Sequence, residues 1–328
     1  MSSRMFVLML SIIAAVASMP LLAQPRYSAW SPPVNPGAPI NSPFTEIGAT
    51  ASRHGRTLYF SSNRPCDAED AVSDFNLWVA RRSSPDAPWE EPRCLVINAD
   101  ARVAGDAPFQ DREPELSRDE HWLYFASDRP GSLGPPLTMG GGDIWVSWRA
   151  NVFDDQGWSD PINLAGVNTV SRESNPQYFE NEDHGIPQLF FGTTKDGISD
   201  IWVVDVLNGV VAGSPRRVDE VNTDQLLEAG NSVTFDGLEM FLFRGRMAAG
   251  IPFDIYTATR PDATSPWSSP VNLGPTVNAP DNDQAPEISP DRTTLFFASN
   301  RPGSIPGPTG APSNDLWMAT RTWGNTAR

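Results

Sequence analysis

Two glutamates at matching places in a repeated sequence have the clearest potential for chemistry. Glu115 and Glu287 each follow, by four residues, an acidic residue that recurs along the chain. In the other three copies of the repeat this position is neutral: Thr50, Gln177 or Ser232. Glycoside hydrolysis needs two carboxyl groups, one acting as acid and the other as base or nucleophile. We therefore consider Glu115 and Glu287 as a catalytic pair at the mouth of a channel, the alternative being that both are ordinary polar strand residues.

Charged residues also recur once in every copy. The acidic series is Glu46, Asp111, Glu173, Glu228 and Asp283, and the basic series is Arg64, Arg129, Lys195, Arg246 and Arg301. They could line a charged mouth that binds a ligand. We favour a ring of ion pairs that joins neighbouring units, because one ligand does not need five copies of a group. Arg112 and Glu113 depart from the pattern, since only the second copy carries charges there.

The copies themselves predict the fold. Each has a short apolar strand ending in a basic residue, clearest in LYFSSNRP at 58–65, LYFASDRP at 123–130 and LFFASNRP at 295–302. A loop follows, and then Asp-(Leu/Ile)-Trp or a variant of it, an alternating pattern that favours a strand. Proline and glycine separate these segments, and helical periodicity is lacking after the N-terminal segment. Four-stranded units repeated about a centre are propeller blades, so we predict an all-β, five-bladed β-propeller.

The two ends of the chain complete one blade. The fifth copy lacks the Trp-Ser-x-Pro strand that closes other copies, whereas Trp30–Asn35 matches Trp267–Asn272. We expect the N-terminal segment to supply the outer strand of the last blade, which covers an exposed edge and closes the ring. The repeats lie near residues 46–98, 111–168, 173–222, 228–278 and 283–321, the last completed by 30–41.

Two further series accompany each blade. We interpret the residue that opens the third strand as a turn or strand cap, and the aromatic residue two positions later as packing between blades. These residues are Asn76, Asp143, Asp200, Asp254 and Asp315, with Trp78, Trp145, Trp202, Tyr256 and Trp317.

The pattern Ser-Pro-Asp-x-x-x-Leu-x-Phe-x-Ser-Asn-Arg, followed by Asp-(Leu/Ile)-Trp, resembles the WD40-like propeller repeat of the periplasmic Tol translocation protein and of many secreted bacterial proteins. The resemblance spans Trp30 to Arg321 and implies a propeller. It implies no particular activity, since such families include scaffolds, binding proteins and modules attached to enzymes.

Residues 1–23 read as a secretory signal peptide, with Arg4 before a short apolar stretch and Leu21-Leu22-Ala23 as a cleavage site. The remaining residues, 24–328, are expected to form one exported, monomeric domain in the periplasm or outside the cell. In such a compartment, Cys66 and Cys94 are either bridged or two free thiols.

The composition excludes several partners and cofactors. A net charge of −16 argues against non-specific binding to nucleic acid or anionic lipid. His54, His121 and His184 belong to different blades, so neither a histidine triad nor a zinc site is expected. We predict no cofactor and no metal site.

These observations favour an exported binding or scaffold protein that recognises a protein or glycan through its charged, loop-bearing face. The alternatives are a carbohydrate-active hydrolase and a purely structural interaction module. We lean against an enzyme; if the chain is one, we expect a glycoside hydrolase that uses Glu115 and Glu287.

Overall fold

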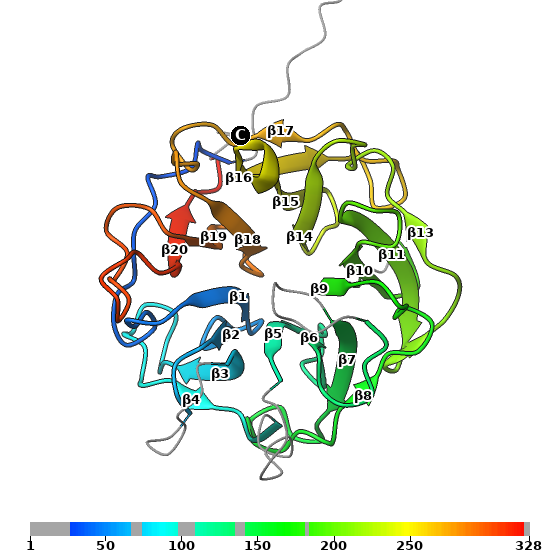
Figure 1. Ribbon diagram of the computed structural model, residues 1–328, viewed down its shortest axis with the longest axis horizontal. Coiled ribbons are helices and arrows are strands. Elements are labelled where there is room, and N and C mark those ends of the chain that lie inside the picture. Colours follow the sequence, from blue (N-terminus) through cyan, green and yellow to red (C-terminus); the bar gives the residue numbers. More distant parts are fainter. Residues whose placement is uncertain (1–26, 67–73, 98–108, 135–141, 181–183, 325–328) are drawn as a thin grey trace, which may run out of the picture.

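Five antiparallel sheets surround a central axis in the computed structural model, which describes residues 27–66, 74–97, 109–134, 142–180 and 184–324 (Figure 1). Each inner strand contacts the next around the ring, and the last contacts the first. The predicted all-β, five-bladed propeller is therefore confirmed. The predicted signal peptide and the last residue of the first predicted repeat, Asn98, lie outside the described residues.

Each blade runs outward from the axis as consecutive antiparallel strands. Blade one holds β1 (Glu46–Ala51), β2 (Thr57–Ser62), β3 (Asn76–Arg81) and β4 (Arg93–Cys94), and blade two holds β5 (Asp111–Leu116), β6 (Trp122–Ser127), β7 (Asp143–Trp148) and β8 (Ile162–Asn163). Blade three holds β9 (Glu173–Phe179), β10 (Gln188–Thr193), β11 (Asp200–Leu207), β12 (Val210–Val211) and β13 (Arg216–Arg217). Blade four holds β14 (Leu227–Val233), β15 (Glu239–Arg246), β16 (Ile251–Thr259) and β17 (Val271–Asn272), with a 3₁₀ turn at Met247–Ala249, and blade five holds β18 (Asp283–Ile288), β19 (Thr294–Ser299) and β20 (Asp315–Thr320).

The second strand of each blade is buried on both sides because neighbouring sheets pack face to face. Phe60, Phe125 and Phe297 are completely buried. Core clusters join adjacent blades: Leu77 of blade one packs in the same cluster as Leu123 of blade two. One blade alone would leave these faces exposed to water, so the ring is a single folding unit.

The N-terminal segment closes the ring as predicted. Val34 pairs with Met318 of β20, its N–H donating to the Met318 carbonyl at 2.8 Å and its carbonyl accepting from the Met318 N–H at 2.9 Å. The Ser31 N–H donates to the Thr320 carbonyl at 2.7 Å. The edge of blade five is therefore covered by residues from the other end of the chain.

Every inner strand contains a β-bulge two residues after its recurring acidic residue, which sequence reasoning did not foresee. These residues have φ between 49° and 57° and are Gly48, Glu113, Asn175, Gly230 and Ala285. The register of each inner strand shifts at this point. A bulge re-aims the side chains that follow it. In blade two the bulge lies inside the strand because β5 starts at Asp111.

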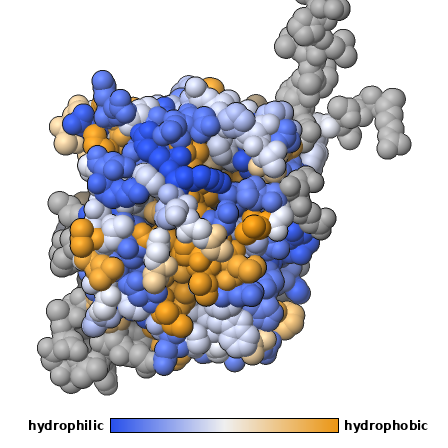
Figure 2. Space-filling view, turned by 90° about the vertical axis from the view of Figure 1, so that its right-hand side faces the viewer, coloured by the Kyte–Doolittle hydropathy of each residue, from blue (hydrophilic) through white to orange (hydrophobic). Residues whose placement is uncertain are grey.

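The outer surface of the ring carries both hydrophilic and apolar side chains. Figure 2 shows the side of the ring that carries β11 and β13, where apolar residues interrupt a mostly hydrophilic surface. Exposed apolar side chains of this region include Leu207 and Val210. Within the described residues, no helix has the length and hydropathy needed to span a membrane.

Candidate active site

The recurring acidic and basic residues are mostly engaged with each other. Four blades hold a buried ion pair, with N–O distances of 2.5 to 2.8 Å: Glu46–Arg64, Asp111–Arg129, Glu228–Arg244 and Asp283–Arg301. Burial raises the pKa of each of these four carboxyl groups, and the partner arginine acts in the opposite direction. Desolvated charges need such partners, so removing either member of a pair would leave an uncompensated buried charge.

The basic residue of blade four was predicted wrongly. Arg244, and not Arg246, contacts Glu228, and Arg244 also lies over the ring of Tyr256 at 4.9 Å. The reason is that β15 continues to Arg246 instead of ending earlier, so the residue two positions before takes the inward place. The exposed Arg246 donates to the Gln225 carbonyl instead.

Among the described residues, blade three lacks the ion pair that the other four blades contain. Lys195 makes no ion pair with Glu173 in the described part of the chain; its Nζ lies 3.2 Å from the centre of the Trp202 ring. Glu173 instead accepts hydrogen bonds from the hydroxyl groups of Thr169 and Thr193, both at 2.8 Å. This blade thus replaces an ion pair with neutral donors and a cation–π contact.

The ion pairs lie within blades, whereas the predicted ring joined neighbouring blades. The connection between blades comes from a further bond of the same arginine. Arg301 donates to the Val277 carbonyl at 2.7 Å, and the next residue, Asn278, bonds both backbone groups of Ile255 in blade four. Arg244 bonds the Val221 carbonyl in the same manner.

The residues that open the third strands act mainly as caps. Asp143 accepts from the backbone N–H groups of Leu133 and Gly134, at 2.7 and 2.9 Å. Asp315 accepts from the Ile305 N–H and from Asn35 of the N-terminal segment.

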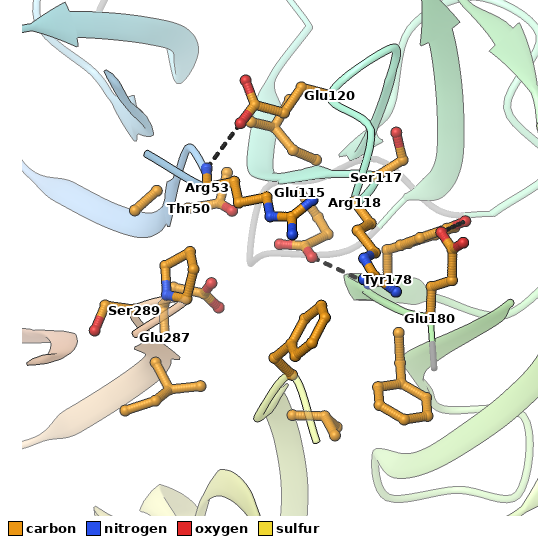
Figure 3. A pocket seen from close by; sticks show the side chains of 17 residues that line it. Thr50, Arg53, Glu115, Ser117, Arg118, Glu120, Tyr178, Glu180, Glu287 and Ser289 are labelled. Carbon is orange, nitrogen blue, oxygen red and sulfur yellow. Dashed lines mark hydrogen bonds between the residues drawn. The ribbon is translucent and has the colours of Figure 1, made fainter. Parts of the chain in front are cut away.

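Glu115 and Glu287 face the central channel from opposite blades, two and five, and line the same cavity (Figure 3). This cavity, of about 110 Å³, opens where the turns between first and second strands gather, beside Arg53, Arg118 and Ser289. The acidic and basic series lie at the other end of the inner strands. The predicted position of this pair on the charged face is therefore wrong, because the two glutamates follow the bulge and belong to the far half of each strand.

Five polar side chains form a ring at this depth, one from each blade, with the two glutamates among them. The side chain of Gln177 donates to Glu115 Oε1 at 2.8 Å, and the Tyr178 N–H donates to the same oxygen at 3.2 Å. The Thr50 hydroxyl also bonds Glu115, and the Ser232 hydroxyl bonds Glu287. No basic side chain neutralises either glutamate within the described residues.

Burial and mutual repulsion keep protons on this pair. Desolvation raises the pKa of Glu287 to about 8. Desolvation, followed by the charge of Glu287, raises the pKa of Glu115 well above its usual range. The charge of Glu287 thus disfavours ionisation of Glu115, so the pair tends to hold one proton between the two carboxyl groups. One group is poised as a base and the other as an acid, the division of roles that active sites obtain from environment.

The mouth of this cavity is amphipathic. The guanidinium groups of Arg53 and Arg118 lie 5.8 and 4.2 Å from the centre of the Phe235 ring. Next to Phe235, in blade three, the Tyr178 hydroxyl donates to Glu180 at 3.1 Å. Donors, acceptors and an aromatic ring thus surround the entrance to the carboxylate pair.

The bulged residues form a narrow waist that divides the channel. A Cβ on Gly48 would lie 2.9 Å from Glu113 Cα, so glycine is needed for the inner strands to approach this closely. The space at the waist is about 30 Å³, roughly that of one water molecule. Both side-chain polar atoms of the buried Asn231, which lines it, lack a hydrogen-bond partner. Sequence reasoning missed Asn231, because an unrepeated asparagine carries no signal.

The remaining predicted residues lie apart from the channel. Cys66 and Cys94 are joined by a disulfide bond with their Cα atoms 5.4 Å apart. His121 bonds the Arg149 carbonyl, and His54 contacts Ser52 in the turn after β1. Among the described residues no group of three or more His, Cys, Asp or Glu side chains could hold a metal ion.

Comparison with known proteins identifies similar folds but no family. No protein-family model and no curated protein matches the chain. The structure is similar to an α-L-arabinofuranosidase from Lactobacillus brevis (TM-score 0.56, 15% identity, covering 88% of this chain and 93% of that chain). It is also similar to a thermostable family-43 glycoside hydrolase (0.57, 14%, 89% and 94%) and to an arabinanase from Bacillus subtilis (0.54, 13%, 90% and 96%).

Identities this low establish the shared architecture alone. The chain is a five-bladed β-propeller, and it shares this fold with these proteins. The comparisons support this fold, and they do not support membership of the WD40-like repeat family.

Proposed function

We propose that this propeller is an exported, carbohydrate-active hydrolase in which Glu115 and Glu287 are the catalytic residues. The observation that carries the proposal is the pair itself: two buried carboxyl groups from blades two and five, neither in an ion pair with a described residue, at the wall of one cavity. Desolvating two such groups together is costly for the fold, which is typical of a functional site. The glycosidase names of the structural neighbours support the same class of reaction.

We assign the roles from the hydrogen bonds that hold Glu115. Glu115 donates its proton to the oxygen of the departing sugar or alcohol, while two donors hold its other carboxyl oxygen in place. Glu287, once ionised, either activates water or attacks the anomeric carbon. The configuration of the released sugar distinguishes these two routes.

The size of the cavity restricts the substrate. At about 110 Å³ it is smaller than the 300–1,000 Å³ of sites for drug-sized ligands. We therefore propose that one terminal sugar, of the size of a pentose, enters, and that the rest of the substrate lies outside near Phe235. An α-L-arabinofuranoside, the substrate type in the name of one neighbour, meets this requirement.

A binding or scaffold function through the charged face has less support, because most of the charges expected to bind a ligand are paired with each other. The relevant compartment is proposed to be the periplasm or the cell exterior.

The test is turnover of chromogenic pentosides, beginning with aryl α-L-arabinofuranosides, by the wild-type protein. Glu115→Gln and Glu287→Gln should each lower kcat by roughly 10²- to 10⁴-fold, the usual contribution of a general acid or base. Glu90→Gln, an exposed carboxyl group in blade one, is the matched control and should turn over normally. Turnover that survives both glutamine substitutions would remove the catalytic assignment, and glycan binding without product release would favour a lectin-like function.

A further inference from the structure

A second cavity, on the opposite side of the waist from Glu115 and Glu287, carries features of an anion site. It has a volume of about 190 Å³, and we call it the arginine pocket. Its charged lining residues, among those the structure describes, are Arg112, Glu113 and Arg172. All five blades contribute to its walls, so it opens around the axis at the start of the inner strands.

The two arginines of this pocket are incompletely partnered. Arg112 donates from Nη2 to the side chain of Gln110 and stacks over Phe75 at 3.9 Å, but its buried Nε has no hydrogen-bond partner. The side chain of Arg172 makes no hydrogen bond or ion pair with another described residue. The buried Nε of Arg112 is costly without an acceptor, and the half-buried Arg172 has donors to spare, so an acceptor from outside would bond both.

The electrostatics of the pocket point the same way. Desolvation lowers the pKa of both arginines, and the charge of Arg172 contributes to the lowered pKa of Arg112, which places the two cations near each other. Glu113 acts on both arginines, but its single negative charge balances only one of the two positive charges. Its Oε2 also accepts a hydrogen bond from the Asn175 N–H at 2.6 Å. Asp128 also acts on Arg112, but it lies outside the lining and accepts from the Gln110 N–H.

The result is a lining with a net charge of +1 in a protein of net charge −16. The opposite wall is apolar: Phe243 and Phe253 meet edge to face with ring centres 5.2 Å apart. A ligand that fits both walls has an anionic group on one side and a small body with an apolar face on the other. Guanidinium groups match the planar geometry of a carboxylate and bind it through two parallel bonds.

We propose that the arginine pocket binds the carboxylate of a small acidic molecule, of the size of a sugar acid. The carboxylate lies between Arg112 and Arg172, and its ring packs on Phe243 and Phe253. This proposal is independent of hydrolysis at Glu115 and Glu287.

Calorimetric titration of the full chain with D-galacturonate and D-glucuronate tests the proposal, with D-galactose and inorganic phosphate as comparison ligands. A uronate should bind and galactose should not. Arg172→Gln should weaken binding by roughly 10- to 100-fold, the loss expected for a charge-assisted hydrogen bond, and Arg172→Lys should weaken it less. Arg216→Gln, an exposed arginine in blade three, is the control and should bind as the wild type does.

Arg172 is the better target because Arg112 also packs on Phe75 and its loss could disturb the fold. Absence of uronate binding, or equal binding by Arg172→Gln, would overturn the proposal. Binding of phosphate in place of uronate would overturn the assignment of a carboxylate. Uronate binding that persists in Glu115→Gln would support the pocket whatever that variant does to turnover.

Discussion

Two sets of carboxyl groups surround the axis of this propeller and differ in how their charge is balanced. The first, at the start of the inner strands, meets an arginine in four blades, and the repeated sequence encodes it. The second consists of Glu115 and Glu287, which meet only neutral donors and each other. Repetition marks what every blade needs for folding, whereas departure from the repeat marks what the molecule needs once.

The largest effect should come from breaking one member of the first set. Arg301→Met leaves Asp283 buried without its cation, and we expect a loss of about 3–5 kcal/mol in the free energy of unfolding at pH 7. Turnover per folded molecule should be unchanged. Urea denaturation measures the loss, and a loss below about 1 kcal/mol would contradict a stabilising role for the pair.

Removing a charge from the second set should change stability in the opposite direction, because Glu287 has no cation to offset its burial. The folded-state pKa of Glu287 is raised, so its contribution is fully present below the unfolded value of 4.5 and is lost as pH rises toward about 8. The wild type should therefore lose stability between pH 5 and pH 9, by on the order of 4 kcal/mol from this group. Glu287→Gln should flatten the dependence, as measured by urea denaturation across this range. An unchanged slope would show that Glu287 is ionised throughout.

The ionisation of Glu287 should also appear in the pH dependence of turnover, where it distinguishes the two sets of carboxyl groups. With Glu287 as base or nucleophile, kcat/KM should rise about tenfold per pH unit below about 8 and then level off. The carboxyl groups that form ion pairs with arginine are not expected to produce this rise of kcat/KM with pH. A pH–rate profile on an aryl pentoside measures it; a rate that falls between pH 6 and pH 8 would exclude this role.

The smallest effect is expected in blade three, which lacks the ion pair. Lys195→Met removes a cation–π contact and leaves Glu173 bonded to two threonines. We expect a loss of about 0.5–1 kcal/mol in the free energy of unfolding. A loss as large as that of Arg301→Met would mean that Glu173 also depends on its cation.

The sequence predicted what is repeated. The blade count, the N-terminal strand that pairs through Val34 and three of the five predicted cations of the ion pairs could be read because each position is filled in the same way several times. Arg244 was missed because strand length, which decides where Arg246 points, is not visible in residue types. The inner-strand bulge was missed because glycine, glutamate, asparagine and alanine all occupy it.

The site was predicted only in part for the same reason. Glu115 and Glu287 could be selected as departures from the pattern, but the end of the channel on which they open depends on the bulge. Arg172 and Asn231 gave no signal, since each stands once in the chain and gains its meaning from residues of other blades that the fold brings near.

The most direct test compares Asp283→Asn with Glu287→Gln, two equivalent changes four residues apart in β18. Stability and turnover on an aryl α-L-arabinofuranoside are measured for both, together with the wild type. We predict that Asp283→Asn loses stability and keeps its turnover per folded molecule, whereas Glu287→Gln keeps or gains stability and loses turnover. Full turnover in Glu287→Gln, or loss of turnover in a folded Asp283→Asn, would contradict the division between a structural set and a catalytic pair.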